Sequence, residues 1–168
     1  MKDKREDTDL FFLKKALEEA KKALKYEEVP VGAVIVKNGR IISRGFNKCI
    51  ALSDPTAHAE IVSLRKAANK LNNYRLNNCE IYVTVEPCAM CAGALINARV
   101  KRIIFGALDK KAGACRSVFK IADGKKLNHK IKISHVAATL VSTECAQIIK
   151  DFFKSRRSFC KRNSSADQ

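Results

Sequence analysis

Between residues 9 and 26, apolar side chains recur at steps of three and four residues, which is the spacing of one face of an α-helix. Lysine and glutamate fill many of the positions in between. The pattern predicts an amphipathic helix near the start of the chain, with a buried face formed by Leu10, Leu13, Leu17, Ala20 and Leu24.

A β-hairpin is predicted after this helix. Residues 31–36 are rich in β-branched side chains, and Asn38-Gly39 is a pair that favours a two-residue hairpin turn. Residues 41–46 then return as the antiparallel partner strand. Residues 47–53 are predicted to form a loop.

Two further helices are predicted with a strand between them. Asp54 or Thr56 is expected to cap the first, whose buried stripe comprises Ala57, Ile61, Leu64, Ala68 and Leu71. Asn72-Asn73-Tyr74 ends it, and residues 80–85 form the strand. Pro87 is expected to open the second helix, where its missing N–H costs least. Small residues would let this helix pack closely on its neighbours: Ala89, Ala92, Gly93 and Ala94.

The remaining pattern completes an α/β fold. It predicts a strand at 102–105, a loop at 106–113, a last strand at 131–135 and a final helix from Thr143 to about residue 158. We therefore expect a three-layer α/β/α sandwich with a mixed sheet of about five strands. One domain should span 1–168, with its core at about 9–158 and a disordered tail at 161–168.

The charge balance indicates a polyanionic partner. Lys and Arg number 33 against 17 acidic residues, which gives a formal net charge of +16 and a pI near 9.7. Basic side chains that contact phosphates release counterions and so favour nucleic-acid binding. The alternative is an ordinary lysine-rich solvated surface.

The chain shows neither a secretory signal nor a membrane segment. Its charged N-terminus lacks an apolar h-region, and no apolar run approaches the roughly 18 residues that a membrane helix needs. We expect a cytoplasmic protein. The seven cysteines are then expected to be reduced thiols or metal ligands rather than a disulfide framework.

Two short motifs carry the candidate chemistry. His58-Ala59-Glu60 is followed by Pro87-Cys88-Ala89-Met90-Cys91, which is the pattern of zinc-dependent deaminases. His58, Cys88 and Cys91 would hold one Zn²⁺ per chain and leave one position for water, with Glu60 as the catalytic acid and base. The alternative is a closed structural zinc site, which would need a fourth ligand such as His129, His135 or another cysteine.

Both motifs are expected at helix starts. The helix dipole there should keep His58 neutral and Glu60 ionised, and it should favour the thiolates of Cys88 and Cys91.

Together with these motifs, much of the chain resembles the bacterial tRNA-specific adenosine deaminases of the cytidine-deaminase-like superfamily. The resemblance runs from about Leu10 to Arg157 and is carried by VPVGAV at 29–34, DPTAHAEI at 54–61, NYRL at 73–76, VEPCAMCAGALI at 85–96, FGALDKKAGA at 105–114 and DFFKSRR at 151–157. It implies hydrolytic conversion of adenosine to inosine at the wobble position of a tRNA anticodon. It also implies an anticodon stem-loop substrate, usually from an arginine tRNA, and a homodimer.

The resemblance also suggests substrate-binding residues. Asn47 would hydrogen-bond the target base, and Asp109 would lie by an RNA ribose. Lys111 and Arg156 would contact phosphates, and Phe153 would stack on or flank an RNA base. Each has an ordinary alternative as a turn, loop, core or solvated residue.

Two other functions use the same motifs. The first is deamination of a free base such as guanine or cytosine, although a small neutral base does not require so large a positive charge. The second is a catalytically silent RNA-binding subunit that keeps the metal for stability, although such a subunit would not require Glu60.

Overall fold

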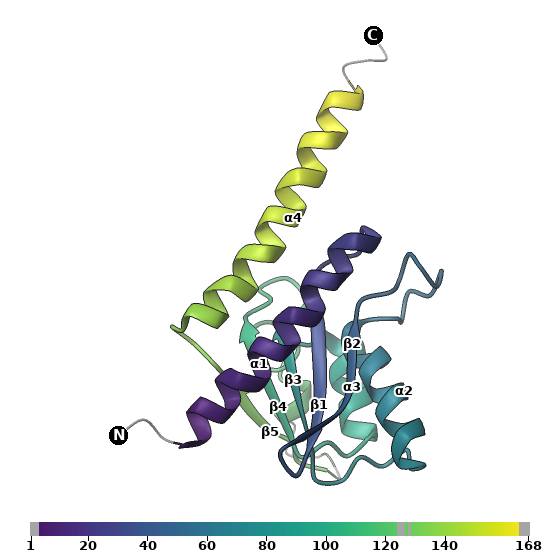
Figure 1. Ribbon diagram of the computed structural model, residues 1–168, viewed down its shortest axis with the longest axis vertical. Coiled ribbons are helices and arrows are strands. Elements are labelled where there is room, and N and C mark those ends of the chain that lie inside the picture. Colours follow the sequence, from purple (N-terminus) through teal and green to yellow (C-terminus); the bar gives the residue numbers. More distant parts are fainter. Residues whose placement is uncertain (1–3, 124–126, 128, 165–168) are drawn as a thin grey trace.

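The computed structural model describes residues 4–123, 127 and 129–164, and it has the element order expected of an α/β protein (Figure 1). The elements are α1 (Lys4–Ala23), η1 (Leu24–Tyr26), β1 (Gly32–Lys37), β2 (Arg40–Phe46), α2 (Ala59–Leu71), β3 (Cys79–Val85), α3 (Ala89–Asn97), β4 (Arg102–Ala107), η2 (Ile121–Asp123), β5 (Lys132–His135) and α4 (Leu140–Ser164).

The sheet is mixed and has five strands in the order β2-β1-β3-β4-β5. β1 pairs antiparallel with both β2 and β3, whereas β3, β4 and β5 run parallel to one another. Asn38 and Gly39 form the hairpin turn with φ values of 51° and 72°, as a two-residue turn between right-twisted strands requires. The predicted hairpin and mixed sheet are confirmed.

Helices cover both faces of the sheet, which confirms the three-layer sandwich. Strand side chains alternate between the faces: Val34 and Tyr82 pack with Phe12 of α1, whereas Ile35 and Ile81 lie in the cluster with residues of α2 and α3. In Figure 1, α1 crosses in front of the strands, and α4 extends beyond them. No helix in the described part of the chain is both long and apolar enough to cross a membrane.

A buried ion pair fastens α1 to the sheet. Arg102 of β4 donates two hydrogen bonds to the Asp9 carboxylate, one of them 2.7 Å long, and the Tyr82 hydroxyl donates to the same carboxylate at 3.0 Å. Asp9 and Arg102 are only 7% and 5% exposed. Sequence reasoning took Asp9 only as the start of the helix, so this contact was not predicted.

The first and last helices extend beyond their predicted ends. α1 begins at Lys4 and gives way to a 3₁₀ turn at Leu24, which is 43% exposed rather than buried. α4 begins at Leu140, because Thr139 and Ser142 exchange hydrogen bonds at its start. It continues to Ser164, so residues 161–164 are helical, which corrects the predicted tail; residues 165–168 lie outside the described part.

The two middle helices start later than predicted. Asp54 closes a local turn by accepting from the Thr56 N–H at 2.8 Å, and α2 begins only at Ala59. Its buried residues are Ala59, Glu60, Val62, Ser63, Leu64 and Ala67, while Ile61, Ala68 and Leu71 are half-buried.

Three expectations about α3 and β4 are wrong. Pro87 precedes the N-cap Cys88 of α3, and a Cβ on Gly93 would meet nothing within 4 Å among the described residues. Gly93 thus gives no close packing within this part of the chain. β4 extends through Gly106 to Ala107, because Ala107 still pairs with Val85 of β3, so the following loop begins later than residue 106.

Candidate active site

The two motifs meet at the end of the sheet where α2 and α3 begin. His58 is the N-cap of α2, and Cys88 is the N-cap of α3; both have extended backbones, with ψ of 156° and 175°. Cys91 lies in the first turn of α3 and is buried. The fold therefore directs two helix starts, 30 residues apart in the chain, towards one point.

The three predicted metal ligands have the spacing of a tetrahedral site. His58 Nδ1 lies 3.7 Å from Cys88 Sγ and 3.6 Å from Cys91 Sγ, and all three atoms are within 4.8 Å of one another. A tetrahedral zinc with bonds of about 2.1 Å to nitrogen and 2.3 Å to sulfur separates those atoms by about 3.6 Å. The donor set of one imidazole and two thiols also suits zinc.

The alternative of a closed site gains no support in the described residues. The cluster there contains three ligands. His129 Nε2 contacts the Val100 carbonyl oxygen at 2.8 Å, and His135 Nε2 contacts that of Gly106 at 3.2 Å, so both rings belong to other contacts.

The electrostatics of the cluster favour a thiolate. The Cys91 thiol donates to Cys88, and together with the His58 ring this lowers the pKa of Cys88 to about 4, despite its partial burial. The same Cys88 interaction raises the pKa of Cys91 and of His58. Cys88 is therefore ionised at neutral pH, which is the form that binds a metal.

Glu60 is buried beside this cluster. Its side chain is only 3% exposed, and burial raises its pKa to about 7. This differs from the expected ionised carboxylate, because the cost of burying a charge outweighs the backbone and dipole effects at the start of α2. A pKa near neutrality is suited to a group that both accepts and donates a proton.

Asn47 has a structural task that the sequence did not indicate. It is 7% exposed, and its Oδ1 accepts a hydrogen bond of 2.8 Å from the Ala59 N–H, the first of α2. Since His58 supplies no side-chain cap, Asn47 caps the helix from a different segment. The bond does not occupy the NH₂ group of Asn47.

Glu86 organises the loop that carries Asp109 and Lys111. It is 3% exposed, and its carboxylate accepts hydrogen bonds from the backbone N–H groups of Asp109, Cys115, Arg116 and Ser117 and from the Ser117 hydroxyl. Burial alone would raise the pKa of Glu86, but these bonds, led by those of Ser117, lower it. Sequence reasoning missed Glu86; its place directly before Pro87 was the only signal.

The proposed RNA-contacting residues differ in their availability. Lys111 is exposed, and Asp109 is half-buried and accepts from the Lys111 and Ala112 N–H groups. Phe153 is 43% exposed and packs edge-to-face against Phe152. Arg156 donates to the Glu27 carbonyl oxygen at 2.9 Å and lies over the Phe152 ring, so this side chain is partly engaged within the protein.

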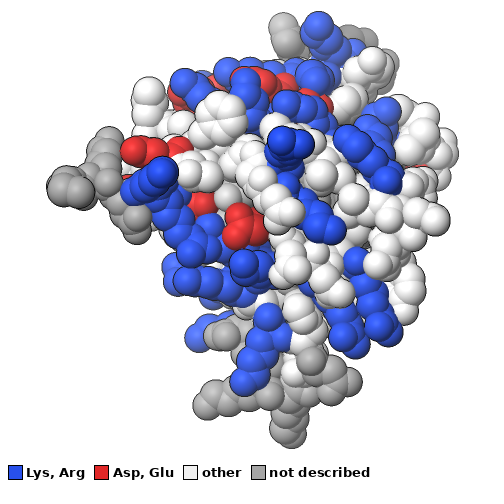
Figure 2. All heavy atoms as spheres, turned by 60° about the horizontal axis from the view of Figure 1, so that its bottom comes forward, with Lys and Arg blue, Asp and Glu red and all other residues white. Residues whose placement is uncertain are grey.

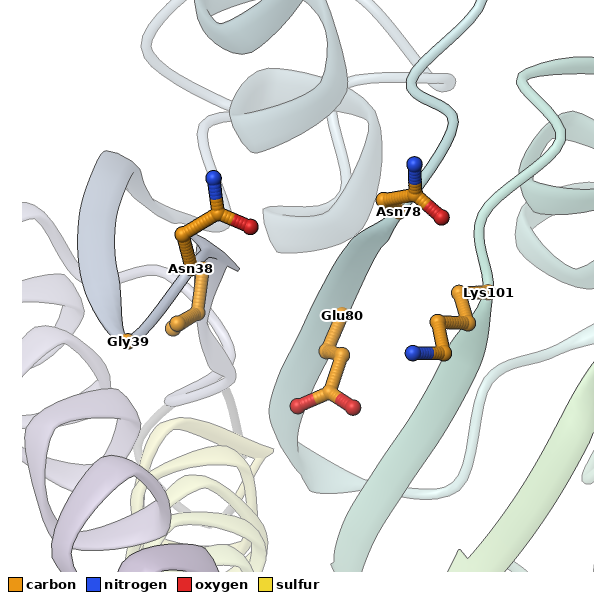
Figure 3. A pocket seen from close by; sticks show the side chains of 6 residues that line it. Asn38, Gly39, Asn78, Glu80 and Lys101 are labelled. Carbon is orange, nitrogen blue, oxygen red and sulfur yellow. The ribbon is translucent and has the colours of Figure 1, made fainter.

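A cavity of about 260 Å³ lies at the other end of the sheet. Figure 3 shows Asn38, Asn78, Glu80 and Lys101 around it. Glu80 is the second residue of β3, whereas Glu86 and the start of α3 follow the end of this strand, about 20 Å away along it. This cavity is therefore separate from the candidate active site.

Comparison with known proteins finds deaminases that match almost the whole chain. The model of the MafB19-like deaminase family matches residues 7–157. A tRNA-specific adenosine deaminase of Aquifex aeolicus is 48% identical over 147 residues, which cover 88% of this chain and 95% of that protein. The corresponding protein of Haemophilus influenzae is 47% identical over 154 residues, covering 91% and 87%.

Solved structures give a consistent result. A structure from a study of A-to-I editing by tRNA:A34 deaminases at the wobble position of transfer RNA is 40% identical, with a TM-score of 0.77; the match covers 83% of this chain and 99% of the other. A guanine deaminase from Bacillus subtilis is 36% identical with a TM-score of 0.57, covering 77% and 85%.

Proposed function

This chain belongs to the tRNA-specific adenosine deaminase family, and from that premise we propose that it converts adenosine to inosine at the wobble position of a tRNA anticodon. It is a hydrolytic deaminase. The observation that carries the proposal is the cluster of His58, Cys88 and Cys91 with buried Glu60 beside it.

His58, Cys88 and Cys91 would hold the zinc. Zinc supplies an activated water near neutral pH. Glu60 accepts a proton from the attacking water as the oxygen adds to carbon 6 of the adenine, and it delivers this proton to the ring nitrogen. It then takes the proton of the new hydroxyl group on carbon 6 and gives it to the departing amine, as the carbon–nitrogen bond breaks and the carbonyl forms. Ammonia leaves and inosine remains. Asn47 holds the start of α2, and its NH₂ group would hydrogen-bond the base.

Several features support an RNA substrate rather than a free base. The net charge is +16, and Lys and Arg cover much of the face drawn in Figure 2, with fewer acidic side chains among them. Such a field attracts a phosphate backbone. Exposed Lys111 and Phe153 would contact phosphate and base, with Asp109 by a ribose. Arg156 would reach phosphate only by giving up part of its contact with Glu27.

Four further assignments are part of the proposal. An arginine tRNA as substrate and a homodimer as the active form rest on the family resemblance. One domain over residues 1–168 and a cytoplasmic location are the expectations from the sequence.

A free-base deaminase is the second candidate, because the guanine deaminase of Bacillus subtilis shares the fold and 36% of the aligned residues. One assay separates the two functions. Zinc-loaded protein is incubated with a stem-loop carrying a wobble adenosine, with the same stem-loop carrying that adenosine one position away, and with free guanine, cytosine and adenine.

We expect inosine in the first RNA, at least about tenfold less in the shifted RNA, and no ammonia from the free bases. Turnover of free bases alone would refute the proposal. Stoichiometric zinc and RNA binding without turnover of any of these substrates would instead favour the silent RNA-binding subunit.

A further inference from the structure

Glu86 joins two parts of the candidate active site. Its backbone leads from the end of β3 directly into Pro87 and the metal-ligand residue Cys88. Its side chain is buried inside the loop at 109–117, which follows β4 and carries Asp109 and Lys111. The backbone of Glu86 thus leads into the start of α3, which carries Cys88 and Cys91, and its side chain is hydrogen-bonded to the loop that is expected to hold RNA.

The loop is wrapped around the carboxylate. Glu86 Oε1 accepts from the N–H groups of Cys115, Arg116 and Ser117 at 3.1, 2.6 and 2.9 Å. Oε2 accepts from the Asp109 N–H at 3.1 Å and from the Ser117 hydroxyl. Donors at both ends of the loop therefore converge on one charged acceptor, and hydrogen bonds to a charged group are stronger than neutral ones.

Gly113 shows how closely the loop fits. A Cβ there would lie 2.5 Å from Glu86 Oε2 and 2.5 Å from the Asp109 carbonyl oxygen. The backbone of this part of the loop also pairs with the residues just before α3. The Ala114 N–H donates to the Pro87 carbonyl at 2.8 Å, and Gly113 forms a β-bridge with Cys88. These hydrogen bonds therefore fix the position of Asp109 relative to Cys88.

We propose that Glu86 is a positioning residue for the substrate. It holds the loop that carries Asp109 and Lys111 at a fixed place beside the metal ligands, so that the target adenosine of the bound RNA lies next to Glu60. This inference rests on the proposed function. Because the loop would act in binding and not in proton transfer, its displacement should raise KM more than it lowers kcat.

The test compares zinc-loaded wild-type protein with Glu86→Gln, which places an NH₂ group among donors. We expect KM for the stem-loop to rise at least about tenfold, equivalent to about 1.4 kcal/mol, while kcat changes less than about threefold and zinc stays at one per chain. Glu80→Gln is the matched control, because Glu80 lies near the start of β3 and Glu86 directly follows its end; it should leave both constants unchanged.

Two further variants act on the same contact from the loop side. Ser117→Ala deletes one donor and should raise KM about two- to threefold, and Gly113→Ala should raise KM because its Cβ meets the carboxylate. If Glu86→Gln does not fold, these variants carry the test. Unchanged KM in folded, zinc-loaded variants, or a fall in kcat alone, would overturn the inference. An inactive wild-type protein would instead refute the proposed function.

Discussion

Replacement of Asn47 by alanine is expected to loosen the start of α2, on which His58 and Glu60 lie. The substitution removes the acceptor of the Ala59 N–H, a bond of 2.8 Å made by a side chain that is 7% exposed. Loss of a helix cap costs about 0.5–2 kcal/mol, and leaving a buried N–H without a partner costs about 1–3 kcal/mol.

These two values describe one missing bond and do not add. We therefore expect the free energy of unfolding to fall by about 2 kcal/mol, which corresponds to a decrease in Tm of about 4–8 °C for a chain of this size. Unfolding must be measured at one fixed free-zinc concentration, because bound metal stabilises the folded state by mass action. The stem-loop assay on the same samples should show a reduced kcat, since Glu60 moves with the helix start.

Two variants make the reasoning testable. Asn47→Asp keeps an oxygen acceptor at the helix N-terminus and should recover at least half of the lost stability, although it loses the NH₂ group expected to bind the base. Asn69→Ala replaces an exposed asparagine within the same helix and should cost nothing. An Asn47→Ala protein as stable as wild type, or Asn47→Asp as unstable as Asn47→Ala, would refute the capping role.

Three further outcomes are expected. Glu60→Gln should retain one zinc per chain by metal analysis, while kcat for the stem-loop falls by about 10²–10⁴-fold. Editing by this variant at the wild-type rate would show that Glu60 does not transfer the proton. Treatment of the wild-type protein with a chelator should abolish editing, and added zinc should restore it. Burial raises the pKa of Cys115 and of Cys145 to about 12, so each thiol stays protonated at pH 8, with a thiolate fraction of only about 10⁻⁴. Mass spectrometry after brief alkylation at pH 8 should find both unlabelled in the folded protein and labelled after unfolding; rapid labelling at either in the folded protein would contradict their burial.

The metal ligands could be predicted from the sequence because their information is local. Cys88 and Cys91 share one helical turn, and the residue types around His58 and Pro87 are a known pattern. The helices and strands were predicted for the same reason, since their periodicity is visible within short windows.

The side chains that hold the site together could not be predicted in this way. The donors to Glu86 lie 23 to 31 residues away, and the N–H group capped by Asn47 lies 12 residues away. No short-range pattern distinguishes these residues from any other Glu or Asn. The helical residues 161–164 were missed for a related reason: they are polar and have no apolar period, yet they continue α4.

The ion pair between Asp9 and Arg102 has a consequence for protein synthesis. Its partners are 93 residues apart, so at about 5–20 residues per second the ribosome needs about 5–20 s to add the arginine after the aspartate. Until then the Asp9 carboxylate lacks its Arg102 partner, and α1 can pack only on β1, β2 and β3. We therefore expect α1 to be more protease-sensitive in nascent chains that end before β4 than in the complete chain, and its protection to increase once β4 has emerged from the exit tunnel.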